Sequence, residues 1–516
     1  MTTREHSKPT PAAIATSSPV TAAAGARVAR AGGNAVDIAV ASALAATLSE
    51  ILMCSLGGSG FVMIRRAGHE PELLDGADAM PDIARSGGEP KWRRVHIEYG
   101  DGIDVMAGPA SIAVPGLLAV LELAWKRHGR LPWREIVAPA LTLARDGFPA
   151  DATTVAWLKL AGRGLFWKQP ASRACFFPDG EYPNVGETFR PPDMDQTLEL
   201  IADEGARALY GGDLAIAFES EVAGHGGFVT REDLAAYSAT ARAPLVLRSG
   251  AFSLALNPPP AIGGTGVGAI IRLLELAYDH AETRAERAVR HARAQACVLG
   301  MRDDAFADRY LTDDDARMLL RRDTLRRNLA AMQSPHTTHL SVATGDGDVV
   351  AITLSNGYGA GITIPGTGIT CNNSLGEPEL NPFGFHAAPP GSRLVSNMSP
   401  TVAWHADGRC VAFGSPGASR ITTSIAQVWS RYSLEDASFE QAVSAPRMHV
   451  EEASDGLRIM HEPGIDTSLL AKAGFGLRPF DSLDMYFGAV QLAGLDLEGL
   501  HAVVDGRRHG YAEFVR

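Results

Sequence analysis

The chain has 516 residues, which suggests two to four domains or one large interleaved fold, and its 46% apolar and 21% charged residues exclude a disordered, collagen-like or coiled-coil protein. Its 47 Lys and Arg against 59 Asp and Glu give a net charge of −12, which disfavours nucleic acid and anionic membrane surfaces as partners. The five cysteines are far apart and form no CxxC pair, so we expect no disulfide framework, no zinc cluster and a cytoplasmic location.

The first part of the chain is predicted to be mostly helical. Helical spacing occurs at 21–31 and 35–50, and a glycine-rich turn then leads into an apolar strand from Phe61. Residues 116–128 and 134–146 are predicted amphipathic helices, each with a proline near its first turn. No apolar run approaches the ~20 residues of a membrane-spanning helix, and the N-terminus shows no signal-peptide pattern.

The second part changes from helical to strand-like sequence at one point. A rigid loop at 257–266 leads into a predicted helix at 267–277, and the charged helical stretch 284–333 is predicted to be a solvated face. From Thr337 onward, two alternating segments flank a TGDGD turn, which predicts a β-hairpin. Common motifs for nucleotides, zinc and nucleophilic serine (GxGxxG behind a strand, P-loop, HExxH, GxSxG) are absent from the sequence.

The start of this hairpin carries a longer pattern. HTTHLSV at 336–342, followed by the DGD turn and a second strand, resembles the start of the small subunit of the γ-glutamyltransferase (glutathione hydrolase) family of N-terminal-nucleophile hydrolases. The resemblance spans nearly the whole chain, through the segments 31–50, 57–61, 113–121, 132–149, 226–237, 366–373, 396–401 and 414–421.

The resemblance implies an α+β fold, a four-layer αββα sandwich in which two fragments of an inactive precursor interleave. The precursor would be cut between His336 and Thr337, leaving a large fragment 1–336 and a small fragment 337–516. A threonine hydroxyl is a poor nucleophile without a base, and the cut frees an α-amine on the same residue that can take its proton. The amide nitrogen of the uncut chain cannot do so.

The resemblance also implies roles for residues around the nucleophile. The backbone N–H groups of Gly417 and Ala418 would form the oxyanion hole, and replacement of the family's second glycine by alanine keeps that donor. Ser355 and Asn356 would orient the nucleophile and bind substrate, with an offset of one or two residues from the family's positions. Glu377 falls on the acidic residue that holds the substrate's α-amine.

Other positions depart from the family's pattern for the γ-glutamyl head group. Ser396 matches the first of two serines that hold the α-carboxylate, but Asn397 replaces the second, and Ser374 replaces an amine-binding glutamine. Ala77, in DGADAMP, stands where the family has an arginine that clamps the α-carboxylate. An arginine–carboxylate pair is bidentate and strong, so its loss removes much of the pocket's glutamyl specificity. The arginines that could substitute are Arg65, Arg66, Arg85 and Arg393.

We therefore expect a self-processing threonine amidohydrolase or acyltransferase that forms an acyl-enzyme on Thr337 and cleaves γ-glutamyl amides such as glutathione. The alternatives are hydrolysis of a small non-glutamyl amide such as oxamate with release of ammonia, β-lactam acylase activity, and a non-catalytic binding relative. Glu377 favours the first reading and Ala77 the small amide, whereas a non-catalytic relative would be expected to lose Thr337. No metal or organic cofactor is implied. The expected partners are a small amide substrate and the chain's own two fragments, with a homodimer of that pair as a further alternative.

Overall fold

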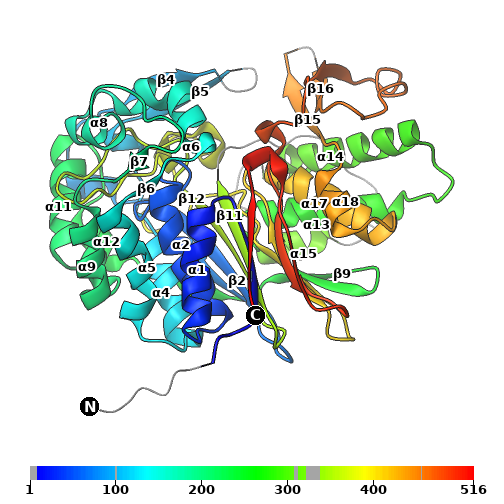
Figure 1. Ribbon diagram of the computed structural model, residues 1–516. Coiled ribbons are helices and arrows are strands. Elements are labelled where there is room, and N and C mark those ends of the chain that lie inside the picture. The colour runs from blue at the N-terminus through cyan, green and yellow to red at the C-terminus, as the bar shows by residue number, and fades with distance from the viewer. Residues whose placement is uncertain (1–7, 99–101, 307–311, 321–336, 455) are drawn as a thin grey trace.

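The computed structural model describes residues 8–98, 102–306, 312–320, 337–454 and 456–516. Two stacked β-sheets form the centre of the molecule, and helices cover the outer face of each sheet (Figure 1). This is the four-layer αββα arrangement of an α+β fold, so the predicted fold class is confirmed.

The first sheet has seven antiparallel strands, in the order β20-β1-β11-β12-β2-β3-β8. Their bounds are Tyr511–Val515, Ala12–Thr16, Thr338–Thr344, Val349–Ser355, Ser59–Arg65, Glu72–Gly76 and Thr240–Arg242. Helices α1 (Pro19–Arg30), α2 (Ala35–Ser49) and α4 (Leu117–His128) pack on its outer face, and α5 (Trp133–Asp146) packs behind α1 and α2.

The second sheet has six antiparallel strands, in the order β19-β18-β14-β13-β10-β9. Their bounds are Leu500–Val503, Gln491–Leu495, Cys410–Gly414, Thr401–Trp404, Phe252–Leu256 and Leu245–Ser249. Helices α13 (Gly263–Leu276) and α17 (Arg420–Leu434) cover it, and α14 (Arg284–Phe306), α15 (Asp313–Leu319) and α18 (Phe439–Ser444) lie around them.

Smaller elements surround the two layers. The strands β15, β16 and β17 form a three-stranded sheet, with bounds Met448–Ala453, Gly456–His461 and Gly476–Pro479. Two further ribbons are β4 (Arg93–Ile97) with β5 (Ile103–Ala107), and β6 (Phe148–Pro149) with β7 (Thr188–Phe189). The remaining α-helices, α3 and α6 to α12, are Ile83–Ser86, Ala152–Trp157, Arg163–Phe166, Pro170–Phe176, Met194–Glu204, Arg207–Tyr210, Asp213–Val222 and Arg231–Ala236. Short helical turns occur at Pro109–Ser111, Leu158–Gly162, Ala223–His225, Ser374–Gly376, Pro378–Leu380, Met485–Phe487 and Gly506–Arg508.

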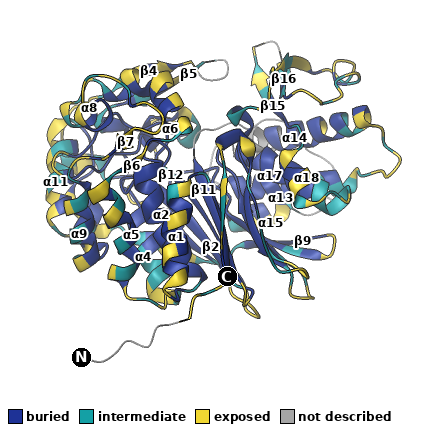
Figure 2. Ribbon diagram, viewed as in Figure 1, coloured by how far each residue is buried: buried dark blue, intermediate teal, exposed yellow. Residues whose placement is uncertain are grey.

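The predicted elements are confirmed for the most part. Every residue of α2 is buried, because the helix lies between the sheet and its neighbours α1 and α5 (Figure 2). Helix α13 begins at Gly263 rather than at the predicted residue 267. The glycines of its first turn pass close to other backbone, because a Cβ atom on Gly264 would lie 2.2 Å from Asn257 O. Within the described ranges, the helices are too short or too polar to cross a lipid bilayer.

The charged stretch 284–333 is not simply a solvated face. Helix α14 buries Ala288, Ala292 and Cys297 against its neighbours, and even the Arg290 side chain is only 5% exposed, because it pairs with Glu282. The prediction of a solvated face is therefore wrong for this part of the stretch, and residues 321–333 lie outside the described part.

The β-hairpin predicted from Thr337 onward is confirmed as β11 and β12, with its turn at 345–348. This hairpin lies in the middle of the seven-stranded sheet, where β11 pairs with β1 and β12 pairs with β2. Strands from before and after residue 337 are therefore interleaved in one sheet, and Thr337 lies at the end of its central strands.

Candidate active site

A row of small side chains crosses one end of the seven-stranded sheet. Thr337 directly precedes β11, and the pairing of Thr338 with Leu354, continued by one residue, places it opposite Ser355. Ser355 pairs with Ser59, and the pairing of Gly60 with Gly76, continued in the same way, places Ala77 opposite Ser59. Directly opposite residues share one face of a sheet. The face is the one between the two sheets, where Ala77 belongs to the buried cluster.

This row forms one wall of a small buried cavity, and the segment before β13 forms the other. The cavity is lined by Ser59, Ala77, Asp78, Thr337, Ser355, Ser374, Glu377, Leu380, Leu394, Val395, Ser396, Asn397 and Met398. Its volume is about 20 Å³, which leaves room for about one water molecule in the uncut chain. Thr337 itself is 2% exposed.

The structure brings together part of the predicted site. Thr337, Ser355, Glu377, Ser396 and Asn397 all line the cavity, although they come from four separate segments of the chain. This grouping places Thr337 among polar side chains that line the same cavity.

Other predicted residues do not line the cavity. Asn356 is buried beside Ser355, where its Nδ2 donates to Cys371 O at 3.4 Å. Gly417 and Ala418 lie in the loop between β14 and α17. His336 lies outside the described residues.

Two carboxyl groups of the cavity have raised pKa values. Burial raises the pKa of Asp78 to about 7, although Ser374 Oγ donates to its Oδ2 at 2.6 Å. Burial also raises the pKa of Glu377 well above its usual value, and the charges of Glu379 and Asp78 raise it further. Among the described residues, Arg393 is the charged partner that lowers the pKa of Asp78, and that arginine does not line the cavity.

The backbone around Thr337 is held from behind. Nη1 of Arg508 donates to Thr337 O at 3.0 Å, and Thr338 Oγ1 donates to Glu50 Oε2 at 2.5 Å. Burial raises the pKa of Glu50 to about 7. Sequence reasoning did not single out Glu50, Arg508 or Asp78. Asp78 had a signal, because it directly follows Ala77 in the DGADAMP stretch, whereas Arg508 lies 171 residues from Thr337 and had none.

The loop with Gly417 and Ala418 has an unusual backbone. Gly417 has a φ of +114°, and Ala418 has a φ of +69°, in the left-handed region that alanine rarely adopts. The loop packs closely on the segment around Gly488, because a Cβ atom on Gly417 would lie 2.9 Å from Gly488 Cα. Ser415 Oγ accepts a hydrogen bond from Ala489 N at 3.0 Å, which ties the two segments together.

None of the four arginines considered as replacements for the missing clamp lines the cavity. Arg65 is at the far end of β2, six residues from Ser59 and therefore about 20 Å away along the strand. Arg85 pairs with Asp233 at 2.9 Å, and Arg393 donates to Ala77 O and to Ser238 O at 3.2 and 2.5 Å. Arg66 follows β2 at the same far end as Arg65.

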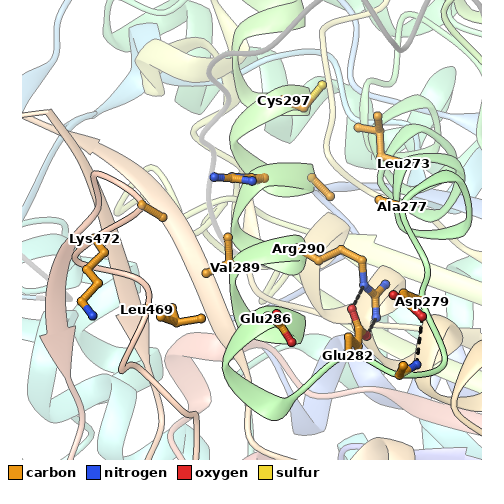
Figure 3. A pocket seen from close by; sticks show the side chains of 14 residues that line it. Leu273, Ala277, Asp279, Glu282, Glu286, Val289, Arg290, Cys297, Leu469 and Lys472 are labelled. Atoms are coloured by element: carbon orange, nitrogen blue, oxygen red, sulfur yellow. Dashed lines mark hydrogen bonds and ion pairs between the residues drawn. The ribbon is translucent and has the colours of Figure 1, made fainter.

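A larger cavity, of about 750 Å³, lies between α13, α14 and the segment 469–473 (Figure 3). Arg290 and Glu282 form an ion pair in its wall. Its described lining residues include no serine or threonine. Burial raises the pKa of the Cys297 thiol to about 12, which disfavours the reactive thiolate form. Among the described residues, no three His, Cys, Asp or Glu side chains are grouped to hold a metal ion.

Comparison with known proteins identifies the family of the chain. The family model of gamma-glutamyltranspeptidase matches residues 21–515. A glutathione hydrolase proenzyme of Escherichia coli is 29% identical over 483 residues, with 86% of this chain and 81% of that protein covered. An acylase ACY 1 proenzyme of Pseudomonas sp. strain SE83 is 31% identical over 464 residues, with 85% and 82% covered.

Solved structures show the same fold. Cephalosporin acylase from Bacillus halodurans superposes with a TM-score of 0.79 at 24% identity, over 99% of this chain and 97% of that one. Gamma-glutamyltranspeptidase from Helicobacter pylori superposes with a TM-score of 0.51 at 25% identity, over 60% of this chain and 89% of that one. The αββα layers are thus those of the N-terminal-nucleophile hydrolases, and the chain belongs to the gamma-glutamyltranspeptidase family.

Proposed function

We propose that this protein is a self-processing threonine amidohydrolase whose nucleophile is Thr337. The observation that carries the proposal is the position of Thr337 in the wall of a buried cavity, beside Ser355 and within the same lining as Glu377. The relatives named glutathione hydrolase and acylase support an enzyme that acts on amides.

Processing would cut the chain between His336 and Thr337 into fragments 1–336 and 337–516. The cut converts an amide nitrogen into an α-amine on the nucleophile itself, and that amine can act as the base. The proenzyme names of the relatives support this step. A cavity of about 20 Å³ in the uncut chain also suits a precursor that does not yet bind substrate.

In the cut enzyme, Thr337 Oγ would attack the carbonyl carbon of the substrate amide while its proton passes to the α-amine. The C–N bond then breaks, and the leaving amine takes the proton from the α-ammonium. Water or an amine acceptor next attacks the acyl ester, which releases the acid or a new amide and returns the proton to Oγ. The N–H groups of Gly417 and Ala418 would stabilise the oxyanion, and Ser355 and Asn356 would orient the nucleophile.

The first substrate candidate is a γ-glutamyl amide such as glutathione. Glu377 would bind the α-amine of its head group, and Ser396 and Asn397 would bind the α-carboxylate. All three side chains line the cavity.

The second candidate is a non-glutamyl amide, either a small one such as oxamate or the acyl group of a β-lactam. The observation that favours it is Ala77, because it lines the cavity and no arginine of the described residues does so. The acylase relatives support it as well. The cytoplasmic location predicted from the cysteines is also a proposal, which fractionation of cells tests.

A denaturing gel of the purified protein tests the nucleophile. Two fragments are expected, and N-terminal sequencing of the smaller one should read Thr-Thr-His-Leu-Ser. Thr337→Ala should remain one chain and hydrolyse no amide, because both the nucleophile and the future base are on this residue.

Thr337→Ser is the matched variant, because it keeps a hydroxyl at the same position. It should still be cut and should retain part of the activity. An enzyme that is active while uncut, or a Thr337→Ala variant that is cut and active, would refute the proposed nucleophile.

A further inference from the structure

The charged side chains that line the cavity are both acidic. Asp78 and Glu377 line it, and no Lys, Arg or His does so in the part of the chain that the structure describes. Both carboxyl groups are buried, and the charge of Asp78 raises the pKa of Glu377. Two carboxylates in one desolvated site repel each other, so a cation in the pocket would stabilise their charged forms.

Neither Arg393, whose charge lowers the pKa of Asp78, nor Arg508, which donates to Thr337 O, lines the cavity. Arg393 lies with its guanidinium 4.2 Å from the ring centre of Tyr237, and its Nη1 donates to Ala77 O at 3.2 Å. Its side chain lines a neighbouring cavity of about 530 Å³, beyond the Ala77 backbone. Its position is fixed further by Ser238 O, to which Nη2 donates at 2.5 Å.

An independent feature also points to a ligand. Asn397 lines the cavity, is 5% exposed, and its Nδ2 has no hydrogen-bond partner among the described residues. Buried donors are nearly always paired in folded proteins, and an unpaired one is costly. A ligand with an oxygen acceptor would pair it.

We propose that the acyl pocket takes an acyl group that carries an amine and no carboxylate. The inference rests on the proposed function, because it concerns the pocket beside the nucleophile Thr337. The ammonium would lie against Asp78 or Glu377, and a neutral oxygen of the acyl group would accept from Asn397 Nδ2. A substrate carboxylate would meet two carboxyl groups without a counter-ion, and burying an unpaired charge is strongly unfavourable.

Four p-nitroanilides with the same four-carbon acyl backbone up to the amine test the charge preference. The 4-aminobutyryl group carries the amine alone, glutaryl a carboxylate alone, γ-glutamyl both, and butyryl neither. We expect kcat/KM of the processed enzyme, after subtraction of the enzyme-free rate, to be at least tenfold higher for 4-aminobutyryl than for glutaryl. The γ-glutamyl compound should also be slower than the 4-aminobutyryl compound.

A shorter pair repeats the test for a small pocket. Ammonia release should be faster from glycinamide, which carries an ammonium, than from oxamate, which carries a carboxylate. Opening of the cavity after cleavage is required for the longer series, since the uncut cavity has a volume of only about 20 Å³.

Variants identify the carboxyl groups that cause the preference. Asp78→Asn and Glu377→Gln keep the shape of the side chain and remove its charge. At least one of them should lower the ratio of kcat/KM between 4-aminobutyryl and butyryl about tenfold. A ratio within one variant is insensitive to partial misfolding, because misfolding lowers both rates equally.

The outcomes separate this inference from the proposed function. Hydrolysis that depends on Thr337 but prefers glutaryl over 4-aminobutyryl, or an unchanged ratio in both carboxyl variants, overturns the charge preference alone. Hydrolysis that persists in Thr337→Ala overturns the proposed nucleophile. Absence of hydrolysis for all of these amides overturns both, because the pocket would then take none of these acyl groups.

Discussion

Ala418 has a backbone conformation that its side chain disfavours. The residue has a φ of +69°, and Gly417 before it has a φ of +114°. Alanine in the left-handed region costs about 1 kcal/mol, whereas glycine adopts it readily. A strained residue persists where surrounding structure fixes it, and such residues cluster at functional sites. The loop therefore has the conformation expected of a fixed donor of backbone N–H groups.

A pair of variants tests this interpretation of the loop. Ala418→Gly keeps the N–H and removes the strain, but it increases the entropy of the unfolded chain. We expect a gain of about 0–1 kcal/mol in the free energy of unfolding and little change in kcat. Gly417→Ala should instead destabilise the protein by about 1–3 kcal/mol, because its Cβ would lie 2.9 Å from Gly488 Cα.

Chemical denaturation and steady-state kinetics of the two variants check this prediction. A strongly destabilised Ala418→Gly variant would show that the methyl group packs favourably, and Gly417→Ala at parental stability would show that the loop is not held rigidly.

At the residue scale, local sequence predicted only part of the site. The TGDGD turn fixes the register of its hairpin, and this register alone brings Thr337 opposite Ser355. Ser59 and Ala77 join the row through pairing with β2 and β3, which come from more than 200 residues earlier. No local pattern encodes that pairing. The DGADAMP stretch pointed to Ala77 through its family resemblance, but the burial of Asp78 required the fold.

At the element scale, a C-terminal turn connects a buried charge cluster to Thr337, the proposed nucleophile. Asp505 accepts from Arg447 Nη2 at 2.5 Å and from Val490 N at 3.0 Å, and Arg507 pairs with Glu462 at 2.5 Å. These side chains are almost fully buried. They fix the turn Gly506–Arg508, from which Arg508 reaches Thr337 O.

We therefore predict that Arg508 positions the nucleophile. Arg508→Met removes a charged hydrogen bond worth about 1.5–3 kcal/mol, which corresponds to about a tenfold to hundredfold loss in rate. The loss should appear in cleavage of the precursor and in kcat more than in KM. The acidic limb of the pH profile of kcat/KM should also move to higher pH, because a positive charge no longer disfavours protonation of the nearby α-amine.

Arg508→Lys is the matched control, since it keeps the charge but not the geometry of the guanidinium. It should retain the pH profile of the parent and recover part of the rate. Parental kinetics and an unshifted pH profile in Arg508→Met would contradict a positioning role, even if that variant were less stable.

The helices show where prediction from local pattern ends. Their spacing predicted α1, α2, α4 and α5 closely, because amphipathic periodicity and caps are local signals. The start of α13 was missed because Gly263, Gly264 and Gly266 look like a loop, and they are helical here because close packing requires small residues. The burial of α14 was missed because Arg290 is neutralised by Glu282, a carboxylate that lies outside the helix.

At the scale of the whole molecule, both sheets contain strands from each side of the proposed cut. In the seven-stranded sheet, β20, β11 and β12 follow residue 336, whereas β1, β2, β3 and β8 precede it. In the six-stranded sheet, β13 of the later part pairs with β10 of the earlier part. Strand order of this kind depends on contacts far apart in sequence, so composition and periodicity could not predict it.

This interleaving predicts that the cut enzyme behaves as one folded unit. Separation of fragments 1–336 and 337–516 would break the pairings β20–β1, β1–β11, β12–β2 and β10–β13, and would expose the apolar cluster between the sheets. Size-exclusion chromatography under native conditions should therefore give one species that contains both fragments in equal amounts. Denaturant should unfold the protein and separate the fragments in the same transition. Fluorescence measures the unfolding, and chromatography measures the separation of the fragments. Fragments that separate at denaturant concentrations below the unfolding transition would contradict the prediction of one folded unit. Each fragment would then have a stable core without strands from the other.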